Sequence, residues 1–333
     1  MGLPPAQCPA RQFVSSDETF AQGVNDVNKI DSLLRDERNA QGLSLRALSA
    51  KIGVSFSTLA RIERGEGEPD TNTRIRLIEW LGPRAAEAGL HLEDVSYAHF
   101  RAAKGVTSTT ISSLVDVSQR IRRQLSADPL DTGWTHFDES EPYSSMNKDD
   151  MEELANSIRT HLSVEPNEAI DPLKLRIEGV QVVELDDIDG LSKSSKFHLN
   201  VTGANDWSAM TIPLSYQQGL WAIVMNRTHS DTRQRVTYLE EFWHIYLGHK
   251  PTKIARVGDS FGRTYIADEE HDAYYLAAAL MLPKTVVEEA VSEKRSADDV
   301  SRKYGTSKQL FEFRVKRLGL WSNYREMNVL LNK

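Results

Sequence analysis

The sequence has a single cysteine, Cys8, among its 333 residues. One cysteine cannot form an intramolecular disulfide, and it cannot build a zinc site from several thiolates. Long apolar runs are missing too, since no stretch approaches the ~18 apolar residues that a membrane-spanning helix needs. Pro4, Pro5 and Pro9 interrupt the first ten residues and no apolar core follows them, so we expect no secretory signal. These absences predict a soluble, cytoplasmic protein.

An excess of positive charge is also missing. The formal net charge is −8 and the isoelectric point is about 5.7, which argues against a protein that coats nucleic acid without regard to sequence. A locally basic face stays compatible with these totals, because the field at a surface depends on where the charges lie. The length of 333 residues and the apolar content of 40% indicate two or three globular domains.

Residues 28–90 have the pattern of several short amphipathic helices separated by turns. Ser44 is placed to cap a helix that ends at Gly53, and Ser55 is placed to cap the next helix, which ends at Gly65. Two short helices joined by a tight turn are typical of a helix-turn-helix. We therefore expect an all-α domain over this range.

Residues 43–70 have a specific spacing of small, apolar and acidic residues. The spacing is formed by Leu48, Gly53, Val54, Ser55, Ile62, Glu63, Gly65 and Pro69. In this spacing the stretch resembles the Xre/Cro-type DNA-binding domain of phage and bacterial repressors. The resemblance implies that the third helix enters the major groove of DNA.

The same resemblance implies which side chains contact DNA. The residues expected to face the bases are Phe56, Ser57 and Arg61, and those expected near phosphates are Ser44, Arg46 and Thr58. Arg61 is suited to pair with a guanine, and Phe56 is suited to contact a thymine methyl group. Phe56 departs from the family pattern, in which a polar residue is commoner at this position.

A module of this size contacts only a few base pairs, so we expect a homodimer on paired half-sites of a double-stranded DNA operator. The charge of this domain does not by itself indicate DNA binding, because residues 31–90 hold nine Lys or Arg and nine Asp or Glu. The alternative interpretation is a helical domain that serves protein contacts.

Two segments are predicted to lie outside the globular domains. One is a flexible arm at residues 1–27, and the other is a linker at residues 91–147 with an acidic run at 138–142. Within the linker, one helix face is apolar and is formed by Ile111, Leu114, Val115, Ile121 and Leu125. We interpret it as a connecting or dimerisation helix. The alternative is a phosphate-binding cluster formed by Arg120, Arg122 and Arg123.

The helical stretch 235–249 carries a candidate catalytic motif. Glu240 and His244 lie four residues apart, so they project from one face of the helix. This is the spacing of the H-E-x-x-H motif, in which two side chains hold zinc and the intervening Glu is the general base. Here Glu240 stands at the first metal-binding position, and Glu241 stands at the position of the base.

Residues around this motif extend the pattern. They are Asn226 at a strand end, the lead-in 233–237, and the acidic helix 270–283 with its Ala-Ala-x-Leu-x-x-Pro ending. In this order of elements the chain resembles the ImmA/IrrE metallopeptidase family. We therefore expect residues 148–333 to form an α+β, metallopeptidase-like domain, which makes the whole chain multidomain.

The resemblance implies zinc held by the motif and by an acid on the following helix, which corresponds to Asp272 or Glu270. Glu240, His244 and Asp272 would place two anions on one Zn²⁺, which weakens its ability to acidify a bound water. An oxygen-rich set also favours harder cations such as Mn²⁺ or Mg²⁺.

Two further residues of the motif helix bear on this site. Trp243 replaces the small residue of the family and is expected to crowd the cleft. His249 is expected to be a poor replacement ligand, because five residues beyond His244 is about 140° round a helix.

The sequence thus favours a sequence-specific transcriptional regulator whose second domain is a pseudo-enzyme that senses an unknown ligand or protein effector. Its cofactor is expected to be none or a weakly held divalent metal, zinc if any. One alternative is an active metallopeptidase that cleaves a repressor, with Glu241 as its base. Another is an antitoxin-like or immunity protein, in which both domains serve protein contacts.

The closing segment, residues 296–320, also has helix-turn-helix character. Its cations are Lys308, Arg314, Lys316 and Arg317. Packing inside the second domain is the favoured interpretation, and contact with nucleic acid is the alternative.

Overall fold

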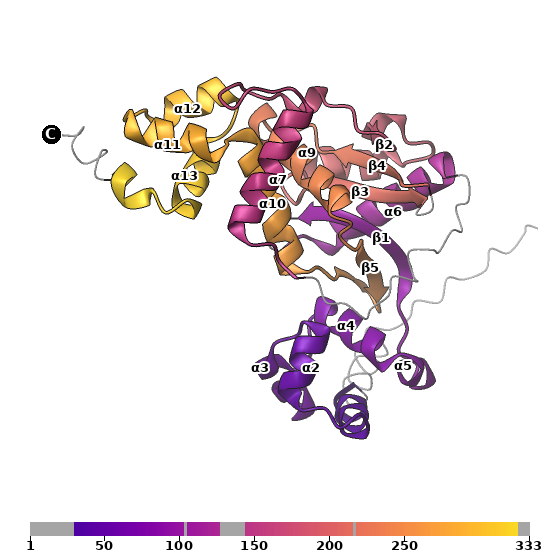
Figure 1. The fold of residues 1–333 in the computed structure, drawn as a ribbon. Coiled ribbons are helices and arrows are strands. Elements are labelled where there is room, and N and C mark those ends of the chain that lie inside the picture. The colour runs from indigo at the N-terminus through magenta and orange to yellow at the C-terminus, as the bar shows by residue number, and fades with distance from the viewer. Residues whose placement is uncertain (1–29, 103–104, 127–143, 216–217, 326–333) are drawn as a thin grey trace, which may run out of the picture. The chain divides into compact units, whose positions relative to one another are not determined.

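The computed structural model describes residues 30–102, 105–126, 144–215 and 218–325 (Figure 1). The predicted arm at 1–27, Cys8 and the acidic run at 138–142 lie outside the described residues. The chain divides into two compact units, Met1–Glu93 and Asp94–Lys333, and each is described by itself below.

The first unit is helical. A helix covers residues 30–40, and the helices that follow are α2 (Leu45–Ile52), α3 (Phe56–Glu63), α4 (Thr71–Leu81) and α5 (Pro83–Glu87). Their apolar faces form a core that includes Leu34, Leu48, Leu59, Ile75 and Leu77. The predicted helix-turn-helix over α2 and α3 is confirmed.

Local capping explains why α2 and α3 begin and end where they do. Ser44 accepts a hydrogen bond from the backbone N–H of Ala47, and Ser55 accepts one from that of Thr58. Gly53 ends α2 in the left-handed conformation, with φ 65°, which other residues adopt only with strain. The turn between the two helices is therefore encoded by Gly53, which ends α2, and Ser55, which caps α3.

The second unit is built on a six-stranded sheet in the order β2-β4-β3-β1-β5-β6. The strands are β1 (Glu93–Ala102), β2 (Val180–Val183), β3 (Trp207–Ser215), β4 (Leu220–Met225), β5 (Thr252–Val257) and β6 (Ser260–Arg263). β1 and β4 both run antiparallel to β3, β2 runs parallel to β4, and β5 pairs with β6 as a hairpin. This unit has the mixed α and β content that the sequence predicts.

Helices cover both faces of this sheet. The helices of this unit are α6 (Ser108–Leu125), α7 (Lys148–His161), α8 (Lys193–Phe197), α9 (Asp231–Tyr246), α10 (Ala267–Met281), α11 (Lys284–Ser292), α12 (Ala297–Tyr304) and α13 (Lys308–Arg317), with short turns η2 (Pro172–Lys174), η3 (Leu185–Asp187) and η4 (His198–Thr202). Side chains alternate along β3, so Met210 and Ile212 pack with α6, while Ala209 packs with Tyr238 of α9.

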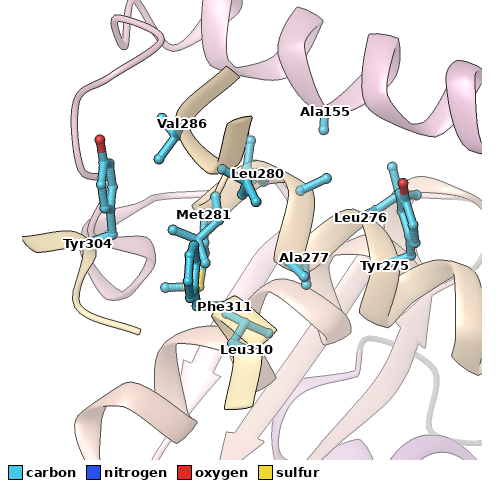
Figure 2. Packing of buried hydrophobic residues seen from close by; sticks show 14 of the residues in the cluster. Ala155, Tyr275, Leu276, Ala277, Leu280, Met281, Val286, Tyr304, Leu310 and Phe311 are labelled. Atoms are coloured by element: carbon cyan, nitrogen blue, oxygen red, sulfur yellow. The ribbon is translucent and has the colours of Figure 1, made fainter. Parts of the chain in front are cut away.

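The largest apolar core lies among the helices rather than on the sheet. α10 packs against α9 and α7, and its buried residues join those of α11, α12 and α13 in one cluster. Figure 2 shows part of this cluster, including Leu280 and Met281 of α10 and Phe311 of α13. This core holds α9 and α10 next to each other, which positions the candidate site between them.

The described part of residues 91–147 is not a linker, which corrects the prediction. β1 lies inside the sheet, and α6 buries Ile111, Leu114 and Ile121 against it. The apolar helix face expected for dimerisation is used within the unit, because that sheet face would otherwise be exposed to water. Arg120 forms an ion pair with Asp116 at 2.7 Å.

The closing helix pair packs inside the second unit. Leu310, Phe311 and Val315 of α13 are buried in the helical core. Arg314, which the sequence groups with the cations that would contact nucleic acid, is fully buried and bound to Glu152. In the part of the chain that the structure describes, no helix combines the length and apolar character needed to cross a membrane.

Candidate functional site

The predicted DNA-contacting residues lie on α2 and α3 or at the start of α2. Ser44, Arg46, Phe56, Ser57 and Arg61 are exposed, and Thr58 is half-buried. The structure brings Arg46 and Phe56 together, with the guanidinium carbon 5.9 Å from the ring centroid, which restricts both side chains. Ser55 bonds to the hydroxyls of Ser57 and Thr58 at 3.0 and 2.8 Å, so the first turn of α3 is ordered before any ligand binds.

The motif residues on α9 are buried rather than open to a cleft. Glu240 is 4% exposed, Glu241 1% and His244 4%. Glu241, at the position of the general base, accepts a hydrogen bond at 2.6 Å from the hydroxyl of Thr211 on β3. That residue is itself fully buried. The carboxylate is therefore fixed by the sheet beneath it.

His249 lies beside His244, which corrects the expectation that it would point elsewhere. α9 ends at Tyr246, and Gly248 follows in the left-handed conformation with φ 66°, so the chain turns back on the helix. The N–H of His249 bonds to the carbonyl of His244 at 3.0 Å. The Nδ1 atoms of the two rings are 2.9 Å apart. The 140° estimate fails because it assumes that the helix continues.

A third histidine, His99, carries no signal of function in the sequence. It lies on β1 opposite Thr211 of β3, and its ring stacks on that of His244 at 4.7 Å between centroids and 20° between planes. His99 is 3% exposed. A buried polar residue on a strand is a recognisable signal, but only once residues 93–102 are known to be a strand.

His99, His244 and His249 form a histidine cluster, and burial keeps His99 and His249 unprotonated. Burial lowers the pKa of His99 to about 3; repulsion from His249 adds to the shift, and a hydrogen bond to the backbone of His249 opposes it. Burial also lowers the pKa of His249 to about 4, against the attraction of Asp272. Both rings are therefore neutral at neutral pH.

Asp272 of α10 is engaged by a segment that precedes α7. Its carboxylate accepts hydrogen bonds from the hydroxyl of Ser145 at 2.7 Å and from the backbone N–H of Met146 at 2.9 Å. The Nδ1 atom of His271 lies 3.0 Å from it. Asp272 is completely buried. Its two oxygens are thus occupied by the chain itself.

Comparison with family models finds two matches. Residues 34–82 match a helix-turn-helix model, and residues 196–316 match the model of the IrrE N-terminal-like domain of peptidase family M78. The chain joins an Xre-type helix-turn-helix to an IrrE-like domain. No curated protein and no solved structure matches the chain. The match to the IrrE-like domain begins after β1, α6 and α7, so His99 and Ser145 come from outside it.

The residues present do not fit the zinc ion that the IrrE-like family implies. Zinc needs its ligand atoms at about 2.0–2.2 Å, yet Asp272 is bonded to Ser145 and Met146, and Nδ1 of His244 faces His249. Glu270 approaches Nε2 of His244 only to 3.9 Å. Among the described residues, no three His, Cys, Asp or Glu side chains are arranged to hold a metal ion.

A positive charge in the IrrE-like domain is supplied by Arg263 at the end of β6. Its guanidinium donates to the carbonyl of Phe100 at 2.7 Å and lies 4.5 Å from that ring. Burial lowers the pKa of Arg263, while the negative charges of Glu270 and Glu241 raise it. This arginine, absent from the predicted site, thus partly offsets the acidic groups of α9 and α10.

Proposed function

We propose that this protein is a sequence-specific transcriptional regulator that binds a DNA operator as a homodimer in the cytoplasm. The helix-turn-helix match and the ordered, exposed face of α3 support DNA binding. In this proposal the IrrE-like domain is a sensor or partner-binding module rather than a working peptidase.

One observation carries the second half of the proposal: the catalytic motif is closed. Glu241, at the position of the base, is 1% exposed. A general base must come within about 2.6–3.2 Å of the proton that it removes, directly or through one water. Here its Oε2 is bonded to Thr211, and His99 covers the neighbouring ring of His244. A polypeptide substrate would have to displace these neighbours to reach this carboxylate.

The DNA half is tested by selecting preferred sequences from random duplexes with the full-length chain. Arg61→Ala is expected to weaken discrimination at one base position by ~1–3 kcal/mol, because a bidentate pair with guanine is lost. Arg302→Ala, which removes an exposed arginine of α12, is the matched control and should leave the selected sequence unchanged. Unaltered discrimination in Arg61→Ala would remove this residue from the base-reading set.

The proposal that the IrrE-like domain is not a working peptidase is also tested with the full-length chain. The proposal predicts no chelator-sensitive cleavage of repressor proteins, and no difference between the wild-type chain and Glu241→Gln in a proteolysis assay. Cleavage that is lost in Glu241→Gln would establish the peptidase alternative. A selection that enriches no DNA would instead favour an antitoxin-like or immunity role.

A further inference from the structure

Residues from outside the matched IrrE-like region reach both halves of the candidate metal site. From β1, His99 stacks on His244 of α9. From the segment before α7, Ser145 and Met146 bond to Asp272 of α10. Both contributors lie between the two matched regions, 34–82 and 196–316.

A zinc ion in a peptidase site has a structural effect besides its chemistry. It joins the elements that carry its ligands, and this link contributes to folding. The elements concerned here are α9 and α10, which pack side by side. The candidate ligands His244 and Asp272 are each engaged by another segment of the chain.

We propose that the segment between the two matched regions supplies the link that a zinc ion makes in this family: His99 of β1 holds α9, and Ser145 with Met146 holds α10. The inference rests on the proposed function only in treating the site as closed to substrate. It assigns a positioning role to His99, whose ring stacks on His244 and is hydrogen-bonded to the backbone of His249; its Nε2 atom is buried without a hydrogen-bond partner among the described residues.

Other contacts show that β1 is held firmly at this point. Asp94 pairs with Arg256 of β5 at 2.8 Å, and the carbonyl of Phe100 accepts from Arg263 of β6. Ser96 bonds to Ser118 of α6 at 2.8 Å. His99 is therefore one anchor among several along β1, and it contacts α9.

The position of β1 in the chain places this anchor close in sequence to the helix-turn-helix unit. α5 ends at Glu87 and β1 begins at Glu93, so residues 88–92 separate the helix-turn-helix unit from the strand. β1 is the point at which the DNA-binding unit is attached.

The test is thermal unfolding of the full-length chain, with and without a chelator. The wild-type Tm is expected to be the same in both, and metal analysis should find no stoichiometric ion. His99→Ala should lower the Tm of the second unit by about 5 °C, because it removes a buried ring from a packed site. His161→Ala, at an exposed position at the end of α7, is the control and should leave the Tm unchanged.

Two additions make the stacking role distinguishable from a general loss of packing. Millimolar imidazole should restore part of the lost Tm in His99→Ala by filling the cavity, and should not change the wild-type Tm. His99→Phe keeps a flat ring against His244 but loses the hydrogen bond to the backbone of His249, so its Tm should lie between those of the wild type and His99→Ala. This variant keeps the test valid should His99→Ala fail to fold.

Opposite results overturn the inference. A wild-type Tm that falls in chelator, or one bound metal per chain, would show that an ion makes the link. A His99→Phe Tm as low as that of His99→Ala would show that stacking is not the contact that matters. Bound metal without proteolysis would contradict this inference alone. Proteolysis that is lost in Glu241→Gln would contradict the proposed function.

Discussion

Replacing Glu152 by alanine is expected to destabilise the second unit, residues 94–333, by about 3–5 kcal/mol, because it leaves the buried guanidinium of Arg314 without its partner. Glu152 of α7 binds Arg314 of α13 through two hydrogen bonds, of 2.6 and 2.8 Å. It also accepts from the hydroxyl of Tyr275 on α10 at 2.6 Å. Arg314 is fully buried and donates to the carbonyl of Leu282. One carboxylate thus joins three helices.

The measurement is urea unfolding followed by far-ultraviolet circular dichroism, with separate transitions fitted for the two units. Glu153→Ala is the matched control, since this residue is the exposed neighbour of Glu152 on the same helix. It should change the free energy of unfolding by less than ~0.5 kcal/mol. Equal effects of the two substitutions would contradict the prediction.

A double variant separates two contributions to the free energy of unfolding: the penalty of leaving Arg314 buried without a partner, and the net stabilisation from the ion pair. Glu152→Leu combined with Arg314→Met removes both charges and keeps apolar volume at the site. Such replacements of buried pairs are often close to neutral, so the double variant should be clearly more stable than Glu152→Ala. If it is equally unstable, the loss comes from packing around α13 rather than from Arg314.

Glu269→Gln is expected to stabilise the chain at pH 8 by on the order of 3 kcal/mol and to have little effect at pH 4. Burial raises the pKa of Glu269 from its ordinary 4.5 to about 7, with the charge of Glu270 acting in the same direction. The backbone N–H of Lys250 and its ammonium oppose the shift. Glutamine keeps the acceptor for that N–H and cannot ionise.

The sign follows from proton binding. Between pH 4.5 and 7 the folded state keeps the proton on Glu269 while the unfolded state has released it. The stability associated with this group is therefore present below pH 4.5 and is lost as the pH rises through 7. His99 and His249, with pKa values lowered to about 3 and about 4, act oppositely, since the unfolded chain binds their protons first as the pH falls below 6.5.

Because these groups oppose one another, the test compares variants rather than reading the wild-type profile alone. The free energy of unfolding is measured from pH 4 to pH 8 for the wild type, for Glu269→Gln and for Asp268→Asn, an exposed position in the same turn. The difference between wild type and Glu269→Gln should grow with pH through 7. A difference that is constant across this range would show that Glu269 is ionised in the folded chain.

The helix-turn-helix could be predicted from the sequence because its signals are local. Ser44 and Ser55 cap helices through backbone N–H groups three residues away, and Gly53 adopts a conformation that other residues avoid. Each of these interactions lies within one turn of chain. The pattern of residues therefore predicts the turn before any tertiary contact forms.

The candidate site was predictable only in part. The spacing of Glu240 and His244 predicts one buried helix, and α9 confirms it. His99 lies far from this helix in sequence and meets it through the pairing of β1 with β3. Strand pairing of this kind is set by the whole sheet, because each strand is stabilised by its neighbours and not by its own residues.

His249 shows the same limit at short range. Its distance from His244 in sequence suggests separation on a helix, but α9 ends before it and Gly248 reverses the chain. The same limit applies to Asp272, because nothing near it in sequence indicates that Ser145 and Met146 donate hydrogen bonds to its carboxylate. A side chain's partners depend on which surfaces are buried together.

By itself the sequence determined the capped helices of the first unit, the helical motif of α9 and the replacement of an imidazole by Glu240, all of which are properties of neighbouring residues. Only the tertiary structure decided that β1 and α6 belong to the second unit, that three histidines meet, and that Asp272 is bonded to the chain. Those outcomes depend on burial between distant segments, whose free energy comes from removing apolar surface from water and pairing buried polar groups.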